Sequence, residues 1–436
     1  MRWFLFGALA LTIVATTSVF NLGSREQLVP DDSCAQPPDR IVFFVIDTLR
    51  ADVPGFAGGP ATTPTLDRLA TEGQAFDDAV AAYHATTMSM AALFTGRTPS
   101  LESGDRRKSV ELNGRTWCGL FWLQPHANEA RCIPAAIPTL AEVLASLGYE
   151  TLGVVSNELL FAPFGLERGF DRWEEVGGRI IFTRPGIKER EAAHRSRAAA
   201  AVNARVMDVL RGRSSDRFFL YVHYMDVHDY ALRSFDREKY VDAVTTVDSA
   251  IREVVEFLER EALSENALIV VTSDHGERFG EQHLLPGTAS HAGNPSFEEL
   301  LRVPLIVHPG CFAATEHPMR GQDTFRRITE IAGANLSMSP DLEDGELFVS
   351  EKEWQTYRNG RWKSFLPRSG DRLHLVDLET DPAERRDVAP AHPAIAQAHR
   401  MRIQTFTTQL ATARASPTGL TPEDKRRLRA LGYLDD

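Results

Sequence analysis

Acidic and histidine side chains follow three strongly apolar runs of the sequence. Asp47 ends the run over residues 41–46, Asp226 and His228 follow residues 218–222, and Asp274 and His275 follow residues 267–271. Carboxylates and neutral imidazoles are ligands for divalent cations such as Zn²⁺, Mn²⁺ or Ca²⁺. One such residue after one strand means little, but acids and histidines after three separate strands indicate a shared site.

Two of these residues also have a purely structural interpretation. Asp274 would serve as the N-cap of a helix that begins at Gly276, and Asp47 precedes a segment that would form a turn or a cap. Adjacent ligands such as Asp274 and His275 need the irregular backbone of a loop, which the following glycine allows. The local sequence alone leaves both interpretations open.

The elements around these residues indicate a doubly wound α/β domain. Continuous apolar runs are typical of strands buried on both faces of a parallel sheet, and amphipathic helices alternate with them. In such a fold the ligand site lies beyond the carboxyl ends of the strands. Strands are predicted at 41–46, 151–155, 218–222, 267–271 and 303–307, and helices at 137–147, 198–210 and 240–258.

After about residue 310 the pattern changes to short strands separated by turns. The strands are predicted at 346–350, 354–359, 361–365 and 373–378, and a final helix at 393–411. We therefore expect a catalytic domain over residues 41–310 and a smaller C-terminal subdomain over residues 311–436. The subdomain should consist of a small antiparallel sheet and a helix.

The first 40 residues have the pattern of a targeting segment. Arg2 precedes an uncharged run from Trp3 to Ser24 that is strongly apolar through Phe20. Such a run over residues 1–24 predicts a signal peptide or a membrane anchor, and the lack of a small-x-small cleavage site slightly favours an anchor over residues 3–20. Residues 25–40, rich in proline, predict a linker. We expect an exported protein, periplasmic or extracellular, that this segment would attach to the membrane if it is not cleaved.

Charge and cysteine content narrow the class of protein further. The net charge of -12 argues against a nucleic acid as partner, because phosphate backbones attract lysine and arginine. Export would place the four cysteines in an oxidising compartment. Cys118 and Cys132 are close in sequence and are predicted to form a disulfide. Cys34 and Cys311 give no readable pairing.

Several blocks of the sequence, in the expected order, resemble the sulfatase family within the alkaline phosphatase superfamily. The blocks are residues 47–52, 63–73, 93–97, 223–229, 272–277, 301–305, 376–382 and 428–434. The likeness covers nearly everything after residue 40. It implies an alkaline-phosphatase-like, mostly parallel sheet and one divalent metal ion, Zn, Mn or Ca, held by Asp47, Asp274 and His275.

The resemblance also implies a nucleophile at the start of the helix that carries residues 93–97. The family motif reads Cys or Ser, x, Pro, x, Arg, and its Cys or Ser becomes formylglycine. Counting back from residue 93 places Thr86 at the nucleophile, with Met88 and Met90 at the Pro and Arg positions. Threonine cannot form the aldehyde. A hydroxyl beside a divalent cation is still a usable nucleophile, and threonine has this role in phosphoesterases and phosphoethanolamine transferases of the superfamily.

Histidines complete the implied site. His228 and His291 are similar to the substrate-contacting positions of the family, where either would bind ester oxygens or protonate the leaving group. His283 is a weaker candidate. Members with two metals add an Asp-x-x-x-His set, but Tyr230 stands four residues after Asp226, so we expect a single metal.

These features together predict a metal-dependent hydrolase or transferase of phosphate or sulfate esters. The substrate would be a small molecule, a glycan or a lipid headgroup. Phosphate is favoured because formylglycine enzymes use a second hydroxyl to expel sulfate, and Thr86 has a single oxygen. The alternative is a catalytically decayed sulfatase-like protein that binds a glycan or lipid headgroup. The missing motif arginine favours this alternative, and the three retained metal ligands oppose it.

Overall fold

The structure is a computed structural model. It describes residues 34–98, 110–112, 115–117, 138–161, 166–177, 192, 195–230, 236–291, 294–313, 315, 317–336, 342–351, 353–370 and 372–414. The predicted signal peptide or anchor and the Cys118–Cys132 disulfide lie outside these residues and stay predictions. Within the described ranges, no helix is both long enough and apolar enough to cross a membrane.

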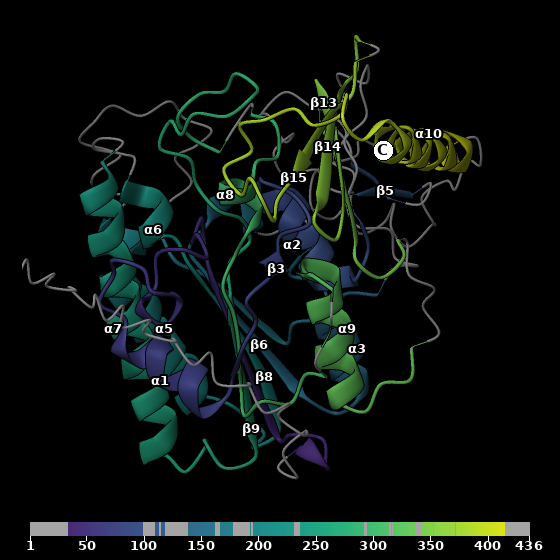
Figure 1. Ribbon diagram of the computed structural model, residues 1–436. Helices are drawn as coiled ribbons and strands as arrows, with labels where there is room; N and C mark the ends of the chain where they lie inside the picture. Colours follow the sequence, from purple (N-terminus) through teal and green to yellow (C-terminus); the bar gives the residue numbers. More distant parts are fainter. Residues whose placement is uncertain are drawn as a thin grey trace, which may run out of the picture.

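A central sheet of seven strands organises the described part of the chain (Figure 1). All neighbours in this sheet are parallel except β10, which runs antiparallel to both β9 and β2. Its strands, in spatial order, are β2 (Gln74–Ala75), β10 (Leu305–His308), β9 (Ala267–Thr272), β1 (Arg40–Ile46), β8 (Phe218–Tyr224), β6 (Glu150–Val155) and β7 (Arg172–Glu175).

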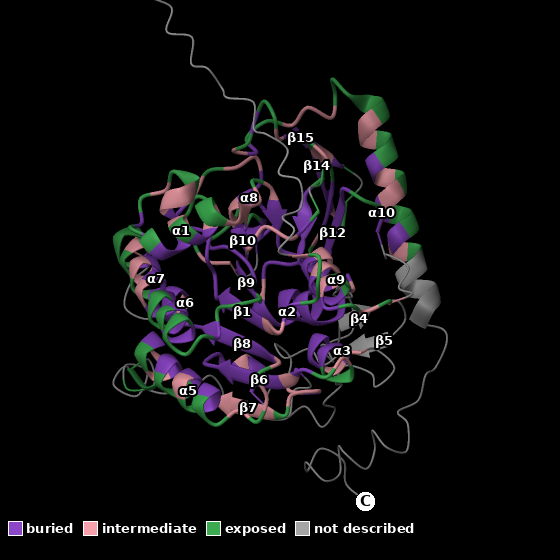
Figure 2. Ribbon diagram, turned by 90° about the horizontal axis from the view of Figure 1, so that it is seen from below, coloured by how far each residue is buried: buried purple, intermediate pink, exposed green. Residues whose placement is uncertain are grey.

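Helices cover both faces of the sheet, as the views in Figures 1 and 2 show. One face carries α1 (Pro64–Glu72), α5 (Ala199–Arg211) and α7 (Arg237–Arg260), and the other carries α2 (Thr86–Thr95), α3 (Leu140–Ser146) and α9 (Gly321–Ile331). Alternate residues of β1 enter the two cores: Phe43 packs with the α2 side and Phe44 with the α7 side. The predicted doubly wound fold is confirmed.

The predicted C-terminal antiparallel sheet is also confirmed. Its order is β12 (Glu346–Ser350), β13 (Trp354–Asn359), β14 (Trp362–Pro367) and β15 (His374–Asp377), followed by α10 (Pro393–Arg414). The sheet lies beside α8, near the end of the central sheet that carries the candidate site (Figure 1).

Short elements complete the described structure. They are β3 (Ala79–Val80) paired with β11 (Met319–Arg320), β4 (Val110–Leu112) paired with β5 (Arg115–Trp117), α6 (Asp226–Asp229), α8 (Glu298–Leu301), and the 3₁₀ turns η2 (Gly55–Ala57) and η4 (Glu158–Leu160). Cys34 and Cys311 form a disulfide between positions 277 residues apart, a pairing that was not predicted.

Candidate active site

Asp47, Asp274 and His275 lie together at the carboxyl edge of the central sheet. One ligand atom from each falls within 4.8 Å of the others, and all three side chains are buried. Strand register explains the meeting, because β1 and β9 are parallel neighbours with Val45 opposite Thr272. Residues shortly past the ends of adjacent parallel strands must share one edge of the sheet.

The carboxylate of Asp47 is held by one of its two oxygens. Oδ2 accepts hydrogen bonds from Asn157 Nδ2 at 2.6 Å and from His223 Nε2 at 3.1 Å. Oδ1 is buried and accepts no hydrogen bond from any described residue. Because an unpaired buried carboxylate oxygen is costly, Oδ1 lies where a cation would compensate for its lost hydration.

Asp274 and His275 show the same arrangement. Asp274 Oδ1 accepts from the backbone N–H groups of Thr48 at 3.1 Å and His275 at 2.8 Å, while Oδ2 has no hydrogen-bond partner in the described part of the chain. His275 Nδ1 lies 2.8 Å from the Gly276 carbonyl oxygen. A carbonyl only accepts, so Nδ1 carries the proton and Nε2 keeps its lone pair for a ligand.

The electrostatics of the three residues also fit a divalent cation. Burial and the nearby Asp47 charge raise the pKa of Asp274 well above its ordinary value. Burial also acts to raise the pKa of Asp47, but the His223 hydrogen bond and nearby histidine charges outweigh it and hold that pKa low. Burial lowers the pKa of His275 and so favours the neutral ligand form. Two adjacent buried carboxylates and a neutral imidazole are a donor set that a divalent cation would stabilise.

Thr86 lies beside this set as the first residue of α2. Its Oγ1 is 3.5 Å from His275 Nε2. The Thr86 hydroxyl also acts to lower the pKa of Asp274, although burial and the charge of Asp47 outweigh this effect. The helix starts after Ala85, whose backbone is extended, and ends at Gly96, whose φ is 66°. The first amides of a helix have no partner within it, so the start of α2 favours an anion next to Thr86.

His228 and His291 stand at the edge of the same space. The ring of His291 lies 4.7 Å from that of His275 and 5.4 Å from that of His228, measured between centroids. Nδ1 of His291 is 3.3 Å from a carboxylate oxygen of Glu277, and Nδ1 of His228 is 3.7 Å from one of Asp229. Each imidazole therefore turns one nitrogen toward a buried carboxylate.

A buried ion pair supports the position of His228. Arg197 binds Asp229 through two hydrogen bonds of 2.7 and 2.5 Å, and Asp229 closes the short helix α6 that carries the histidine. Burial alone would lower the pKa of His228, but the Asp229 carboxylate and the charges of Asp47 and Glu277 raise it to about 9. At neutral pH this imidazole is positively charged and suited to bind an anion or donate a proton.

Asn157 and His223 are site residues that sequence reasoning missed. The signal available for His223 was a histidine inside an otherwise apolar strand, β8, where it is fully buried. Asn157 follows β6 and hydrogen-bonds its own η4 turn, with Oδ1 accepting from Leu159 N at 2.9 Å. Because asparagine commonly forms such a local bond in turns, nothing in the sequence distinguishes Asn157 from an ordinary turn residue.

Two other residues named from the sequence lie outside the three-residue cluster. Asp226 Oδ1 accepts from the N–H of Ala199 at 3.0 Å, at the start of α5. His283 lies in a second cluster, with Nε2 at 2.5 Å from a Glu299 oxygen and with Glu384 nearby. Lys363 already supplies positive charge there, with Nζ 2.7 Å from Glu384 Oε1, so we assign this cluster a structural role.

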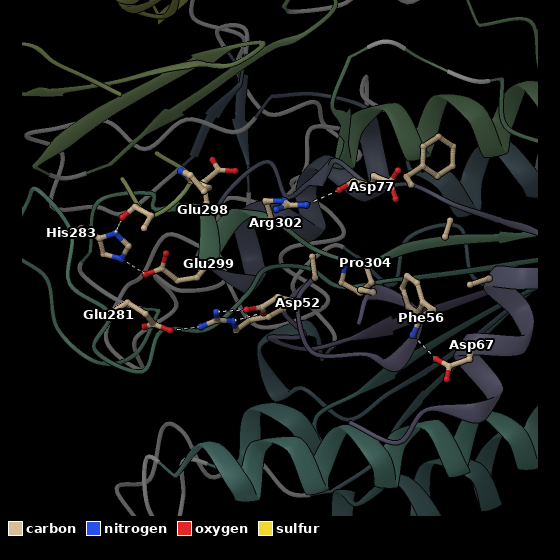
Figure 3. Close-up of a pocket in the computed structure, with 18 of the residues that line it drawn as sticks. Asp52, Phe56, Asp67, Asp77, Glu281, His283, Glu298, Glu299, Arg302 and Pro304 are labelled. Atoms are coloured by element: carbon tan, nitrogen blue, oxygen red, sulfur yellow. Dashed lines mark hydrogen bonds and ion pairs between the residues drawn. The ribbon is translucent and has the colours of Figure 1, made fainter. Parts of the chain in front are cut away.

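A cavity of about 710 Å³ lies along one side of His283 (Figure 3). Its lining includes Arg50, Asp52, Glu281, Glu299 and Arg302, but none of the metal-site candidates or Thr86. Figure 3 shows the charged groups directed at one another, and Arg50 binds both Asp52 and Glu281. The cavity is therefore separate from the candidate active site.

Comparison with known proteins identifies the family and the fold of the chain. The family described as Sulfatase matches residues 39–325. An arylsulfatase of Hemicentrotus pulcherrimus is 25% identical over 343 residues, which cover 68% of this chain and 58% of the relative. The chain thus spans less than two thirds of that relative.

Solved structures share the fold over most of the chain. The crystal structure of Ps i-CgsB in complex with k-i-k-neocarrahexaose has a TM-score of 0.62 and 20% identity, covering 91% of this chain and 98% of that chain. The phosphonate monoester hydrolase of Agrobacterium radiobacter has a TM-score of 0.59 and 15% identity, covering 86% and 96%. These likenesses establish the fold alone. The family match, over well more than half of the sequence, establishes that this chain belongs to the sulfatase family.

Proposed function

We propose that this chain is a metal-dependent ester hydrolase or transferase in which Thr86 is the nucleophile. One observation carries the proposal: the Thr86 hydroxyl lies beside the buried cluster of Asp47, Asp274 and His275, whose free ligand atoms point to a cation. Such a cation would favour the ionised form of a nearby hydroxyl and offset negative charge on the ester oxygens.

The chain's own groups supply the remaining chemistry. Thr86 Oγ1, after its proton has passed to solvent, forms a bond to the phosphorus or sulfur of the substrate as the bond to the leaving alcohol oxygen breaks. His228 or His291 gives a proton to that oxygen, so the alcohol leaves neutral. Attack by water, or by an acceptor alcohol, then frees Thr86 and releases the acid or the transferred group. The amides at the start of α2 stabilise the anionic oxygens throughout.

Two arguments bear on whether phosphorus or sulfur is transferred. Membership of the sulfatase family favours sulfate esters. The single oxygen of Thr86 favours phosphate, because a phosphorylated threonine is released by in-line attack without the second hydroxyl of a hydrated aldehyde. A phosphate monoester also carries more negative charge, which a cation stabilises more strongly. We place phosphate esters first.

The organic part of the substrate is proposed from the neighbours. One structure of the same fold was solved with a neocarrahexaose, which supports a glycan ester, with a small molecule or a lipid headgroup as other ester classes. We further propose that the protein acts outside the cytoplasm, because Arg2 precedes the uncharged, largely apolar run from Trp3 to Ser24.

The test compares matched aryl phosphate and aryl sulfate esters as substrates of the metal-loaded protein. Wild type should turn over the phosphate with the higher kcat/KM, Thr86→Ser should retain activity, and Thr86→Ala should lose it. A higher kcat/KM for the sulfate, lost in Thr86→Ala, would reverse the substrate preference and keep the nucleophile. Equal activity in Thr86→Ala would remove the nucleophile.

A catalytically decayed binding protein is the second candidate. The observation that favours it is Met90, which stands at the position of the motif arginine and is buried in the apolar core. Without that arginine, one cation for the developing charge is missing. Metal binding and glycan binding without turnover of either ester would identify this function.

A further inference from the structure

We infer that Tyr221 and His223 form a buried hydrogen-bond relay that fixes Asp47 so that a single oxygen faces the candidate metal. His223 is then a positioning residue of the site. The reaction proposed above gives it no role. The inference rests on the proposed metal site, but it does not depend on which ester is cleaved or whether turnover occurs.

The direction of the relay follows from its partners. His223 Nε2 lies 3.1 Å from Asp47 Oδ2, and the Tyr221 hydroxyl lies 2.8 Å from His223 Nδ1. An ionised carboxylate only accepts, so Nε2 carries the proton. In a neutral imidazole Nδ1 then holds the lone pair and accepts from the tyrosine. Tyr221 thereby fixes the tautomer that donates to Asp47.

The relay is buried, so water cannot replace any of its hydrogen bonds. Tyr221, His223 and Asp47 are each no more than 1% exposed. Burial and the charges of Asp274 and Asp47 raise the pKa of Tyr221 well above its ordinary value, so its hydroxyl stays protonated and able to donate. No bulk water reaches these atoms to replace a lost bond.

The sheet sets the relay in place. Residues 221 and 223 of β8 point to the same face because side chains alternate along a strand. In the parallel register Phe43 lies opposite Tyr221 and Val45 opposite His223, so Asp47 follows on the same side of β1. The Tyr221 ring also packs against those of Phe43 and Phe94, with centroids 6.0 and 4.9 Å away, which restricts the position of its hydroxyl.

Asn157 completes the constraint on Asp47. Its amide donates to the same oxygen, Oδ2, at 2.6 Å, while its own Oδ1 is occupied by Leu159 N. Two donors saturate Oδ2, so the carboxylate offers a metal only Oδ1. One-oxygen carboxylates with an imidazole suit a small ion such as Zn²⁺ or Mn²⁺, whereas Ca²⁺ prefers many oxygens and often takes both from one carboxylate.

The experiment measures metal affinity in the full chain. Zn²⁺ is titrated against a chromogenic chelator for wild type, His223→Ala, His223→Gln and Tyr221→Phe. Loss of an outer-shell partner typically weakens metal binding about 10- to 100-fold, which is the loss expected for His223→Ala. His223→Gln restores an N–H donor and should recover much of the affinity. Tyr221→Phe, which keeps the packing ring, should show a smaller loss.

Two buried residues of the C-terminal sheet region serve as matched controls. His399 contacts Ser364 Oγ through Nδ1 at 3.0 Å, and the Tyr357 hydroxyl donates to Glu346 at 2.6 Å. His399→Ala and Tyr357→Phe should lower the melting temperature and leave Zn²⁺ affinity unchanged. The absorption spectrum of the Co²⁺-loaded protein should change in His223→Ala and stay constant in these controls.

The outcomes separate the relay from the site itself. Wild-type affinity in His223→Ala, or equal losses in His223→Ala and His223→Gln, overturns the relay while leaving the metal site standing. Absence of Zn²⁺ binding in wild type overturns the metal site and the relay together. If His223→Ala fails to fold, Tyr221→Phe decides: unchanged affinity and an unchanged Co²⁺ spectrum reject the relay.

Discussion

Asp274 shows most directly what single atoms contribute to the candidate site. It is buried next to a second carboxylate, and its Oδ2 is unpaired among the described residues. Asp274→Ala should reduce bound metal from about one ion per chain to near zero, because one of the few ligands is lost. Elemental analysis after loading with Zn²⁺, Mn²⁺ or Ca²⁺ measures this.

A buried aspartate away from the site provides the control for Asp274. Asp248 accepts the backbone N–H groups of Thr65 and Leu66 at the start of α1. Asp248→Ala should lower stability by about 1 kcal/mol, as loss of a cap does, and keep the metal. A wild-type protein that retains no ion under any loading condition would contradict the site.

The raised pKa of His228 predicts a pH dependence. Its ordinary value is 6.5 and its value in the fold is about 9. The proton is therefore bound more tightly in the folded state, so its contribution to stability is full below pH 6.5 and is lost as the pH rises through 9. A bound cation would add positive charge nearby and so lower the pKa of His228. In the metal-loaded enzyme, the loss of this proton should therefore occur at or below pH 9.

Activity should follow the same proton. The kcat/KM for an ester with a poor leaving group should fall as the pH rises through the pKa of His228, because the protonated imidazole that donates to the leaving group is lost. His228→Gln should abolish this fall at high pH and reduce kcat/KM for that ester about 10²–10⁴-fold. The kcat/KM for an activated aryl ester should be much less affected. An unchanged profile in His228→Gln would assign the proton to another group.

At the scale of elements, the apolar runs predicted five of the seven strands of the central sheet, because a strand buried on both faces has few polar positions. The short edge strands β2 and β7, which are only partly buried, were not predicted. The prediction at residues 267–271 corresponds to β9, and residues 346–350 and 354–359 coincide with β12 and β13. The order of the strands, and the antiparallel direction of β10, were not predicted. Periodicity reports burial of a segment, and it contains no information about which strand lies beside it.

The site was predictable to the extent that strand ends identify it. Asp47 and His275 follow buried strands, so their meeting follows from the fold class. His223 and Asn157 were missed because their roles depend on the register of β8 against β1 and of β6 against β8. A histidine within a strand can point into the core or toward a ligand, and the sequence does not distinguish the two until the neighbouring strand is known.

Gly96 ends the helix that carries Thr86, and its replacement tests how α2 is held. Its φ is 66°, and an added Cβ would lie 2.6 Å from a ring carbon of Phe325 in α9. Gly96→Ala should therefore destabilise the protein through both backbone strain and overlap, by about 2–4 kcal/mol. Thermal or urea unfolding measures the loss.

Gly148, just past the end of α3, separates these two effects. Its φ is 86°, and nothing lies within 4 Å of an added Cβ. Gly148→Ala should cost only the backbone term, about 1–2 kcal/mol. Equal losses at the two glycines would show that Phe325 yields and that the contact between α2 and α9 does not fix the helix.

At the scale of the whole molecule, a buried lysine joins the C-terminal sheet to α8, beside the central sheet. Lys363 of β14 is fully buried and places Nζ 2.8 Å from Glu298 of α8 and 2.7 Å from Glu384. Lys363→Met should destabilise the protein by about 3–5 kcal/mol, because it removes the cation paired with buried Glu384. It also leaves Glu298 with Arg358 as its remaining ion-pair partner among the described residues. Denaturant unfolding measures the change.

Arg361, in the turn just before β14, is the matched control. The Arg361 side chain is exposed, as is its partner Glu379, while its other partner Asp377 is largely buried. Because the arginine itself stays in water, Arg361→Ala should lower the melting temperature less than Lys363→Met. A similarly small effect for Lys363→Met would mean that apolar packing, rather than this ion pair, holds the C-terminal sheet against α8.

The disulfide between Cys34 and Cys311 has a mechanical consequence. Cys34 lies six residues before Arg40, where the central strand β1 begins, and Cys311 lies three residues after His308, the end of β10. A pulling force applied to the chain ahead of Cys34 therefore passes into the covalent bridge as well as into β1. Without the bridge, β1 would be pulled away from its parallel neighbours one hydrogen bond at a time, beginning at Arg40. With the bridge intact, the force is divided between two strands of the sheet, so Asp47 at the far end of β1 is shielded from tension on the N-terminus.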